Sequence, residues 1–481
     1  TYTFRVSAVN TIGTGNASGT ASASTASAPG APTGLGGTQG VGLVGLSWTV
    51  PSSNGGSAIT DYVVEYSSDS GTTWTTFSDG TSTTTSATVT GLGHSTTYTF
   101  RVSAVNTIGT GNASSTIDVD TAPAPFTDIT ARTLESGSAG VRPSIAIGND
   151  GNPVISHRLQ DAFYPELKIY VCSSADCSSG TSRTLLGTRG MGNTASSIAI
   201  GNDGNPIIAF DARSDGGMKI YFCSSADCAS GTSTTLDSTD DVGYGYGFSL
   251  AVGNDGYPVV AYHADGAGGG LGLYACSATD CSTGTDRTLD SHGGTLGRFA
   301  DVTIGDDGNP IISYYDSLNS SLKVYKCTQS DCSSGYPTTV KSLSGGTGFD
   351  TSIAVGSDGN PLVVYSEWLP GTVEVFACSS ADCSSGSSST IMETSSAADA
   401  LTWHSIAFGP DGSPLIGYSD ANASSKPTVY LCSATDCSTG SATSFDDEGW
   451  SYGLSLAIDD NGNPVITYMN EGLKFATATQ G

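Results

Sequence analysis

The sequence predicts an all-β chain that contains a β-sandwich followed by a β-propeller of seven four-stranded blades. Three observations support this prediction. Apolar residues alternate, or run for four to six positions, between clusters of Gly, Asn, Asp and Ser, which favours strands and turns over long helices. An 18-residue segment recurs unchanged after 96 positions. A shorter phrase occurs seven times at spacings of 50 to 53 residues, a period typical of propeller blades.

The longer repeat defines the N-terminal part of the chain. Residues 1–18, TYTFRVSAVNTIGTGNAS, are identical to residues 97–114. Since an offset of 96 residues is one domain length, we interpret 1–24 as the C-terminal part of a sandwich domain and 29–122 as a complete domain of the same kind. The identical duplication predicts a stalk of tandem domains.

The shorter repeat defines the propeller. Each copy opens with a form of S-I-A-I-G-N-D-G-N-P and contains four expected strands, which in the second copy are 197–200, 206–210, 218–223 and 233–236. The first residues of the seven copies are Ser144, Ser197, Ser249, Asp301, Ser352, Ser405 and Ser455.

The ends of the repeat region predict how the ring closes. The seventh copy supplies three strands before the sequence stops, whereas residues 130–136 resemble the fourth strand of other copies but stand upstream of the first. We expect this N-terminal strand to pair beside 473–478 and complete the last blade, because closure removes exposed sheet edges. The predicted propeller spans 126–481, behind a proline-rich linker at 121–125.

The second strand of each blade is apolar on both faces, as expected when blades stack on one another. An aromatic residue or histidine recurs four positions after the proline that opens this strand, and we interpret this series as packing between blades rather than as a ligand platform. The series is His157, Phe210, Tyr262, Tyr314, Tyr365, Tyr418 and Tyr468.

The twelve cysteines form six C-x4-C pairs with none left over, and each pair is expected to follow the third strand of a blade and to span the loop to the fourth. Disulfides are the preferred interpretation, because zinc needs a second pair nearby and the outer loops of separate blades lie far apart. Oxidised cysteines predict an extracellular or cell-surface protein. The pairs are Cys172/Cys177, Cys223/Cys228, Cys276/Cys281, Cys327/Cys332, Cys378/Cys383 and Cys432/Cys437.

Two resemblances to known families extend this interpretation. Residues 29–122 resemble a fibronectin type III domain, with APGAPTGL at the start, Trp48 in LSW and Tyr98 in the tyrosine-corner position. The resemblance implies a seven-stranded sandwich that serves as a spacer or adhesion module. Residues 126–481 resemble seven-bladed propellers of "AIGxDGxPVISY" repeats in secreted bacterial proteins, which implies a fold but no particular function.

Charge excludes several classes of partner. The formal net charge of −28 argues against binding to nucleic acid or anionic lipid, because phosphate contacts need clustered Lys and Arg. No run of 18 apolar residues occurs, so we expect no membrane insertion.

Several short motifs are explained more simply by turns and strands than by a catalytic or ligand-binding role. Ser67-x-Asp69-x-Gly71-x-Thr73-Trp74 matches an Asp-box by letter but occurs once, between two expected strands, and is interpreted as a hairpin turn. Gly40-Val-Gly42-Leu-Val-Gly45 precedes a strand, whereas a dinucleotide fingerprint needs a helix there. The Asn/Asp-Gly turns of the blades are interpreted as turns, with calcium as the alternative.

One cluster of residues predicts a binding site. Acids follow the second strands, and aromatic residues precede the first strands, so both sets are expected on one face around the propeller axis. The acids are either solvated or form a ring for calcium or a ligand, and the aromatics either plug the channel or stack on sugars. The candidate ligand-binding residues are Tyr246, Phe299, Phe349, Trp368, Trp403, Trp450, Tyr452, Asp211, Asp316 and Asp420.

These observations favour a non-enzymatic extracellular adhesion protein whose propeller head recognises a cell-surface glycan or protein from a fibronectin type III stalk. No catalytic residues are assigned, and Ca²⁺ is the one candidate cofactor, without an assigned metal site. The first alternative is an extracellular polysaccharide-acting enzyme, a glycoside hydrolase or lyase, which a buried carboxylate pair would favour. The second is a structural subunit of an extracellular filament or surface appendage, in which neighbouring copies are the partners.

Overall fold

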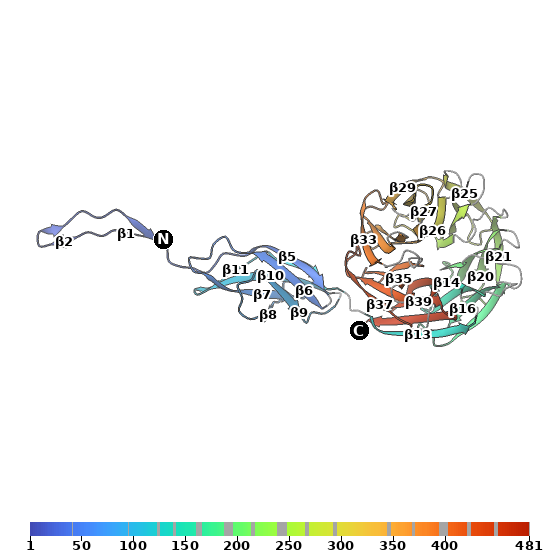
Figure 1. Cartoon of the computed structure of the whole chain (residues 1–481), viewed down its shortest axis with the longest axis horizontal. Coiled ribbons are helices and arrows are strands. Elements are labelled where there is room, and N and C mark those ends of the chain that lie inside the picture. Colours follow the sequence, from blue (N-terminus) through green and yellow to red (C-terminus); the bar gives the residue numbers. More distant parts are fainter. Residues whose placement is uncertain are drawn as a thin grey trace. The chain divides into compact units, whose positions relative to one another are not determined.

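The computed structural model divides into two compact units, Thr1–Ala124 and Pro125–Gly481 (Figure 1). It describes all residues except 41, 95, 123–125, 138–140, 160–165, 187–195, 213–216, 238–247, 265–268, 292–295, 344–347, 368–370, 394–402, 421–424, 447–450 and 481. The described residues contain strands and turns and no helix, which confirms the predicted all-β class.

The first 24 residues form two short antiparallel pairs that continue one hairpin. Strand β1 (Tyr2–Phe4) pairs with β4 (Ala21–Ala23), and β2 (Val9–Asn10) pairs with β3 (Gly13–Thr14). The side chains of this hairpin are exposed almost throughout.

Residues 29–122 form a sandwich of two sheets. One sheet has the order β5-β6-β9, and the other has the order β11-β10-β7-β8 with β12 also paired to β10. Trp48, Val64 and Phe100 meet in the core between the sheets. The strands are β5 (Thr33–Gly40), β6 (Leu43–Thr49), β7 (Ile59–Ser67), β8 (Thr75–Phe77), β9 (Ser86–Thr90), β10 (Thr97–Asn106), β11 (Gly109–Ala113) and β12 (Ile117–Asp120).

The turn between β7 and β8 confirms the hairpin interpretation of the Asp-box-like motif. The Asp69 carboxylate accepts hydrogen bonds from the Thr73 backbone N–H at 2.8 Å and from the Ser67 hydroxyl at 2.7 Å. The hydrogen bonds from Thr73 and Ser67 lower the pKa of Asp69 to about 2. At the Gly40–Gly45 motif the chain continues into strand β6, as expected for a sheet rather than a nucleotide site.

Residues after Pro125 form seven four-stranded antiparallel sheets, the predicted blades. We number them along the chain. Blade 1 contains β14 (Val141–Ile147), β15 (Pro153–Leu159), β16 (Glu166–Cys172) and β17 (Gly180–Leu186); blade 2 contains β18 (Ser196–Ile200), β19 (Pro206–Asp211), β20 (Met218–Cys223) and β21 (Gly231–Asp237); blade 3 contains β22 (Phe248–Val252), β23 (Pro258–Ala264), β24 (Gly270–Cys276) and β25 (Gly284–Ser291).

The remaining blades follow the same order. Blade 4 contains β26 (Leu296–Ile304), β27 (Pro310–Asp316), β28 (Ser321–Cys327) and β29 (Gly335–Ser342); blade 5 contains β30 (Gly348–Val355), β31 (Pro361–Glu367), β32 (Thr372–Cys378) and β33 (Gly386–Glu393); blade 6 contains β34 (Ser405–Phe408), β35 (Pro414–Asp420), β36 (Lys426–Cys432) and β37 (Gly440–Ser444); blade 7 contains β38 (Tyr452–Ile458), β39 (Pro464–Met469), β40 (Gly472–Gln480) and β13 (Phe126–Ser136).

The predicted closure by an N-terminal strand is confirmed. Strand β13 pairs antiparallel with β40, with Thr130 opposite Thr477 and Ser136 opposite Gly472. In Figure 1 the cyan β13 accordingly lies beside the red C-terminal strands. The first strands of the blades contact one another in sequence, from β14 through β38 and back to β14, so these strands surround the axis of a closed ring.

A ring of side chains links the first strands around this axis. The seven residues that open the repeat phrase occupy equivalent positions, and each boundary between blades carries a hydrogen bond to one of them. Ser197 Oγ, for example, accepts the Leu250 backbone N–H at 3.0 Å. The other bonds are Ile198 N to Ser144 Oγ, Ser249 Oγ to Asp301 Oδ1, Ile353 N to Asp301 Oδ2, Ile406 N to Ser352 Oγ, Leu456 N to Ser405 Oγ and Ile145 N to Ser455 Oγ. We call these seven residues the axial ring.

The aromatic series of the second strands packs between blades, as predicted. Tyr314, Tyr365, Tyr418, Tyr468 and Phe210 are among the largest fully buried side chains. The hydroxyl groups of Tyr314, Tyr365 and Tyr468 donate hydrogen bonds to neighbouring acids. Tyr314 donates to Asp290 of the preceding blade at 2.6 Å, and Tyr468 donates to Asp446 at 2.6 Å.

The turns between first and second strands carry the Asn/Asp-Gly sequences and are satisfied internally. In blade 2 the Asp203 carboxylate accepts the Asn205 backbone N–H at 3.0 Å and its side-chain amide at 2.8 Å. Gly204 has φ +81°, and a Cβ there would lie 2.8 Å from Asn149 Nδ2 of blade 1. The left-handed backbone therefore favours glycine here, and the Asn149 side chain of the preceding blade's turn lies close to it.

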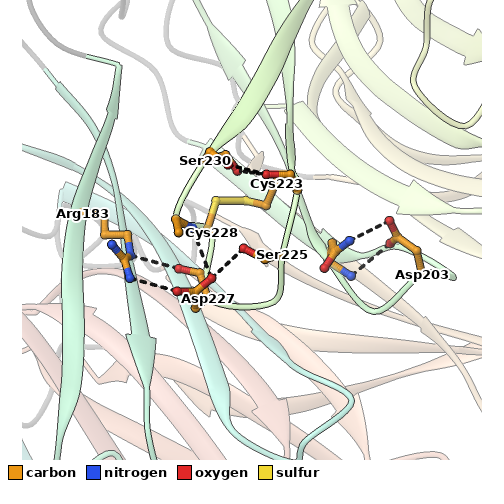
Figure 2. The surroundings of a disulfide bond; sticks show 10 residues. Arg183, Asp203, Cys223, Ser225, Asp227, Cys228 and Ser230 are labelled. Carbon is orange, nitrogen blue, oxygen red and sulfur yellow. Dashed lines mark hydrogen bonds and ion pairs between the residues drawn. A yellow bond between two sulfur atoms is a disulfide. The ribbon is translucent and has the colours of Figure 1, made fainter.

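The six predicted disulfides are confirmed, and no cysteine is left free. Figure 2 shows the loop of blade 2 around Cys223 and Cys228. Antiparallel topology puts the disulfide loops at the same end of the blades as the Asn/Asp-Gly turns. We call this end the lower face and the opposite end the upper face. The bonds join Cys172 to Cys177, Cys223 to Cys228, Cys276 to Cys281, Cys327 to Cys332, Cys378 to Cys383 and Cys432 to Cys437.

The expectation that each disulfide spans the whole loop to the fourth strand is wrong. The first cysteine is the last residue of the third strand, but the second lies inside the loop, three residues before the fourth strand begins. In blade 1 the Cys177 backbone N–H donates to the Ser174 carbonyl oxygen at 2.9 Å, so the loop turns back on itself. The disulfide therefore fastens a tight turn to the end of the third strand.

The second cysteine of each pair has a left-handed backbone. This conformation is uncommon for residues other than glycine, and the disulfide is the added constraint that holds it here. A left-handed residue reverses the chain within the loop, which is why the bond need not reach the fourth strand. The φ angles are 50° at Cys177, 48° at Cys228, 49° at Cys281, 52° at Cys332, 52° at Cys383 and 52° at Cys437.

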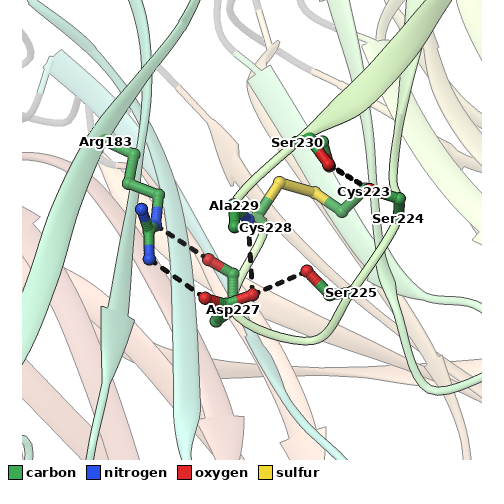
Figure 3. Close-up of polar contacts among 8 residues, drawn as sticks. All are labelled: Arg183, Cys223, Ser224, Ser225, Asp227, Cys228, Ala229 and Ser230. Atoms are coloured by element: carbon green, nitrogen blue, oxygen red, sulfur yellow. Dashed lines mark hydrogen bonds and ion pairs between the residues drawn. A yellow bond between two sulfur atoms is a disulfide. The ribbon is translucent and has the colours of Figure 1, made fainter.

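The acids of several disulfide loops also connect neighbouring blades. Asp227 Oδ1 accepts the Ser225 hydroxyl at 2.6 Å, while Asp227 Oδ2 pairs with Arg183 of blade 1 at 3.0 Å (Figure 3). Arg287 and Asp331 form the same pair between blades 3 and 4 at 2.9 Å, and Arg132 of the closing strand approaches Asp176 of blade 1 at 3.5 Å. These contacts are half-exposed, so each stabilises the ring only modestly.

We expect the axial ring to contribute measurably to stability. Ser197→Ala removes the acceptor of the Leu250 N–H and should lower the free energy of unfolding by about 1–2 kcal/mol, measured by urea denaturation. Ser230→Ala, in an exposed loop, is the matched control and should change it by less than about 0.5 kcal/mol. Equal effects of the two substitutions would contradict a special role for the ring.

We expect a larger loss when a disulfide is removed. Replacing Cys223 and Cys228 by serine together should lower the free energy of unfolding by about 2 kcal/mol, because a short closed loop no longer restricts the unfolded chain. Arg183→Ala, which removes only the exposed ion pair beside that loop, should cost less than about 1 kcal/mol. If Arg183→Ala lowers the free energy of unfolding by more than the double cysteine substitution does, this prediction is wrong.

Candidate binding site at the upper face

The candidate site lies where the first strands begin, at the upper end of the axis. One position of the repeat lies two residues before the axial-ring residue of each blade. It is occupied by Arg142 in blade 1, Phe299 in blade 4, Asp350 in blade 5 and Trp403 in blade 6. We call these four residues the axial cluster. Each of them lies in, or just before, the first strand of its blade.

The backbone at this position is unusual. Arg142, Phe299 and Asp350 have φ angles of 49°, 56° and 58°, in the left-handed region that non-glycine residues seldom adopt. The strand register shifts at the same three places, next to each of these residues. A bulge of this kind redirects a side chain at the rim of a sheet, and such strained residues concentrate at functional sites.

The axial cluster connects blades that are not neighbours. The Arg142 guanidinium lies over the Trp403 ring, with Cζ 4.7 Å from the ring centroid, so blade 1 reaches blade 6 past blade 7. Arg142 also attracts the Asp350 carboxylate of blade 5 electrostatically. The Thr351 hydroxyl donates to the Phe299 carbonyl oxygen at 2.7 Å, which links blades 5 and 4. Cation, aromatic ring and carboxyl group therefore meet at the axis.

Asp350 is the most perturbed acid of this cluster. Burial, with the nearby Asp301 carboxyl, raises the pKa of Asp350 to about 7, although Arg142 and the His404 backbone N–H act in the opposite direction. The His404 N–H donates to Asp350 Oδ2 at 2.9 Å. The His404 ring is fully buried and bonds Ser366 through Nε2, and burial lowers its pKa to about 3, so this histidine is neutral near pH 7.

The structure places only some of the predicted aromatic site residues. Phe299 and Trp403 are half-buried members of the axial cluster. Tyr246, Trp368 and Trp450 lie outside the described residues, as do the side chains of Phe349 and Tyr452, whose backbones belong to β30 and β38.

The predicted acids lie at the upper ends of second strands. Asp211 and Asp316 are 0% and 2% exposed, so they are not solvated loop acids, and Asp420 is half-buried. Asp316 Oδ1 accepts the backbone N–H groups of Leu318 and Asn319, both at 3.1 Å, and therefore caps the turn that follows β27. Within the described part of the chain, no three His, Cys, Asp or Glu side chains are placed to hold a metal ion.

The lower face carries polar clefts of a different character. One of about 380 Å³ lies between blades 1 and 2, lined among others by Asp150, Arg183 and Asp227. A cleft of about 440 Å³ recurs between blades 2 and 3 beside Asp203 and Asp280. Because the same turn and loop residues repeat around the ring, these clefts follow from the repeat and do not single out a ligand site.

Arg142, Asp350 and His404 were not among the predicted site residues. A signal was available in the repeat register, because Arg142 and Asp350 align with Phe299 and Trp403 at one position of the repeat. Residue type alone did not reveal this signal, because a single arginine or aspartate at the start of a strand is ordinarily exposed to solvent.

The comparisons with known proteins address the two units separately. The family model for the fibronectin type III domain matches residues 30–120. Residues 30–120 form a fibronectin type III domain. Its Tyr98 hydroxyl accepts the Gly93 backbone N–H at 3.0 Å, in the position that the resemblance implied. The crystal structure of titin domains A168–A170 is 32% identical over 25% of this chain, with a TM-score of 0.20, and this chain covers 40% of its length.

Solved structures similar to the larger unit share little sequence with it. A protein of unknown function from Dyadobacter fermentans is 10% identical over 73% of this chain and 99% of its own, with a TM-score of 0.45. An α-L-arabinanase from Penicillium chrysogenum, complexed with arabinobiose, is 11% identical over 73% of this chain and 98% of its own, with a TM-score of 0.44. The assignment of seven blades rests on the strand pairing of this chain.

We expect the axial cluster to make stability depend on pH. The folded-state pKa of Asp350, about 7, exceeds the unfolded value of about 4. The difference therefore costs nothing below about pH 4, lowers the free energy of unfolding as the pH rises from about 4 to about 7, and causes no further loss above that. Asp350→Asn removes this cost and should raise the free energy of unfolding at pH 8 by up to about 4 kcal/mol, since each pKa unit corresponds to about 1.4 kcal/mol.

The same substitution should have little effect at pH 4.5, where the folded protein already holds a neutral Asp350. The measurement is urea denaturation at both pH values. Glu393→Gln, an exposed acid at the end of β33, is the control and should change neither value by more than about 0.5 kcal/mol. If Asp350→Asn lowers the free energy of unfolding at pH 8, the claim that the ionised Asp350 carboxylate destabilises the fold is contradicted.

Proposed function

We propose that the protein is a non-enzymatic extracellular binding protein, in which the upper face of the propeller recognises a cell-surface glycan or protein. The observation that carries the proposal is the axial cluster, in which residues of four blades converge on the axis and three of them adopt a strained backbone. Strain of this kind is retained where the surrounding fold enforces it and function uses it.

The chemistry of the cluster suits recognition. Aromatic rings offer an apolar face on which a sugar ring or a side chain packs, and guanidinium and carboxyl groups offer directional hydrogen bonds to hydroxyl or amide groups. Arg142 stacked on Trp403 is held in one orientation, which reduces the entropy lost on binding. Tyr246, Phe349, Trp368, Trp450 and Tyr452, with Asp211 and Asp420, remain part of this proposal as further contacts.

The fibronectin type III domain and the disulfides support the setting. Six disulfides indicate folding in an oxidising environment, and fibronectin type III domains commonly act as spacers or adhesion modules. Among the described residues, no helix has the length and apolar character needed to traverse a membrane. The proposal includes secretion and a stalk that presents the propeller.

A polysaccharide-acting enzyme is the second candidate, and one observation favours it. Asp350 and Asp301 are close enough to interact electrostatically near the axis, as a pair of catalytic carboxyl groups would be. Asp301, however, accepts hydrogen bonds from Ser249, Ser352 and Ile353, all of which hold the axial ring together. This use of Asp301 favours a structural role for the carboxyl, and therefore a binding protein. Release of reducing ends from a polysaccharide panel, lost in Asp350→Asn, would favour the enzyme.

The filament and calcium hypotheses receive less support. Large apolar side chains exposed on the described part of the propeller are Tyr257, Leu318 and Tyr336, which lie on a lower turn, an upper turn and an outer strand. Scattered exposed residues of this kind do not form a packing surface. The acids of the lower turns accept hydrogen bonds from their own loops, as Asp203 does, so a turn function explains them without calcium.

The proposal predicts that the axial cluster carries the binding energy. Trp403→Ala should weaken binding to a printed oligosaccharide array or to intact cells by about thirtyfold, as truncation of a central aromatic contact commonly does. Arg142→Ala should weaken it to a similar extent because Trp403 loses the group stacked on it. Arg183→Ala on the lower face is the matched arginine control and should bind normally.

Thermal unfolding of each variant separates loss of binding from loss of folding. Unchanged binding by folded Trp403→Ala and Arg142→Ala would exclude the upper face as the recognition site. Reduced binding by Arg183→Ala alone would move the site to the lower face.

A further inference from the structure

One lysine and two aspartates share a buried site at the boundary between blades 3 and 4. Lys323 belongs to β28 of blade 4, Asp290 to β25 of blade 3, and Asp316 is the last residue of β27 in blade 4. The three residues are 8%, 5% and 2% exposed. Lys323 Nζ lies 2.5 Å from Asp290 Oδ2 and 4.0 Å from Asp316 Oδ2. Because buried charges are costly, a second acid beside an ion pair that is already complete needs an explanation.

The chain contains a second pair at the same position of the repeat, and it lacks the second acid. Lys168 of blade 1 binds Glu135 of the closing strand at 2.8 Å. The position of Asp316 is occupied in blade 1 by Leu159, the last residue of β15. Among the described residues, Lys168 has no second acid within 4.0 Å. The repeat therefore needs only one acid to link neighbouring blades, and Asp316 is an addition particular to blade 4.

An amine and a carboxyl group condense to an amide when they are held in contact and water is kept away. Contact between Lys323 and Asp290 replaces a bimolecular encounter by an intramolecular one, which raises the effective concentration greatly. Burial excludes the water that would reverse the reaction.

Tyr314 assists the same reaction from the neighbouring strand. Its hydroxyl donates a hydrogen bond to Asp290 Oδ2 at 2.6 Å. Burial and this hydrogen bond raise the pKa of Tyr314, so the hydroxyl stays protonated and polarises the carboxyl group.

We propose that Lys323 and Asp290 form an intramolecular isopeptide bond that joins blade 3 to blade 4 covalently. The Lys323 ammonium gives one proton to Asp290 Oδ2 along their contact, and Nζ then bonds to Cγ of Asp290. The Asp316 carboxylate accepts the second proton from Nζ and passes it to Oδ2, which leaves as water. The Asn319 amide donates to Asp316 Oδ2 at 2.8 Å and holds that carboxylate in place.

The balance of the reaction is simple. One N–C bond forms and one C–O bond breaks, so an ammonium and a carboxylate become an amide and one water molecule. The reaction needs no oxidant, cofactor or energy source. The bond lies inside the propeller and is independent of the recognition proposed for the upper face.

Mass spectrometry of the full chain tests the proposal directly. After reduction of the disulfides and denaturation, the chain should be lighter than its sequence requires by the mass of one water molecule. Trypsin should then release a branched peptide that joins residues 288–298 to residues 299–326, uncut at Lys323, although cleavage after Arg298 separates the two segments in an unlinked chain. Absence of this peptide would overturn the proposal. That includes a chain lightened by one water without the branch, because an aspartate that closes to a succinimide gives the same mass.

Variants test the assigned roles. Lys323→Arg keeps the positive charge but should leave the chain at its full mass. Asp316→Asn keeps a hydrogen-bond acceptor but cannot accept the proton, and should slow bond formation by about a hundredfold, measured by mass at intervals after a short pulse of synthesis. Lys168 and Glu135 are the internal control and should remain unlinked. An unchanged rate in Asp316→Asn, or an equal yield of a branch between Lys168 and Glu135, would overturn the role of Asp316.

Discussion

The propeller depends on satisfying the polar groups of its innermost strands. Each first strand has one edge in its own blade and the other toward the axis, where backbone groups need partners or water. The axial ring meets part of this need at every boundary, since a serine or aspartate oxygen of one blade bonds the next around the circle. Every boundary between blades carries such a bond because the ring is closed, so the pairing of β13 with β40 and the serine or aspartate of each repeat belong to the same constraint.

The lower face adds further links to this ring. Disulfide loops, Asp-Gly turns and Arg–Asp pairs repeat there from blade to blade, and their acids are engaged by neighbouring hydroxyl, amide and guanidinium groups. This repetition from blade to blade ends at the position two residues before the axial ring. Arg142, Phe299, Asp350 and Trp403 share one position of the repeat yet differ in charge, size and chemistry. A regular frame therefore supports an irregular cluster, which is the arrangement expected where a repeat fold acquires a specific site.

Sequence reasoning succeeded where information is periodic and failed where it depends on three-dimensional detail. The repeat spacing predicted the number of blades and the cysteine pairs, and the incomplete seventh copy identified the closing strand, although β13 starts at 126 rather than 130. Cysteine spacing did not reveal that Cys177 and its equivalents lie inside their loops. No periodicity indicates that Arg142 crosses to Trp403, because this contact joins distant repeats. The burial of Asp211 was likewise hidden, since an acid after a strand is usually solvated.

The N-terminal hairpin separates what local sequence determines from what tertiary structure determines. Its register equals that of the complete domain although its apolar side chains are exposed, and the Asn10 side chain accepts a hydrogen bond from the Ile12 backbone N–H in the turn. Asn106 and Gly109 make the same turn in the complete domain. Burial is different, because Phe4 and Phe100 have identical neighbours in sequence and opposite exposure. The two copies therefore share a strand register but not a buried environment, and a two-stranded hairpin alone is at best marginally stable in water.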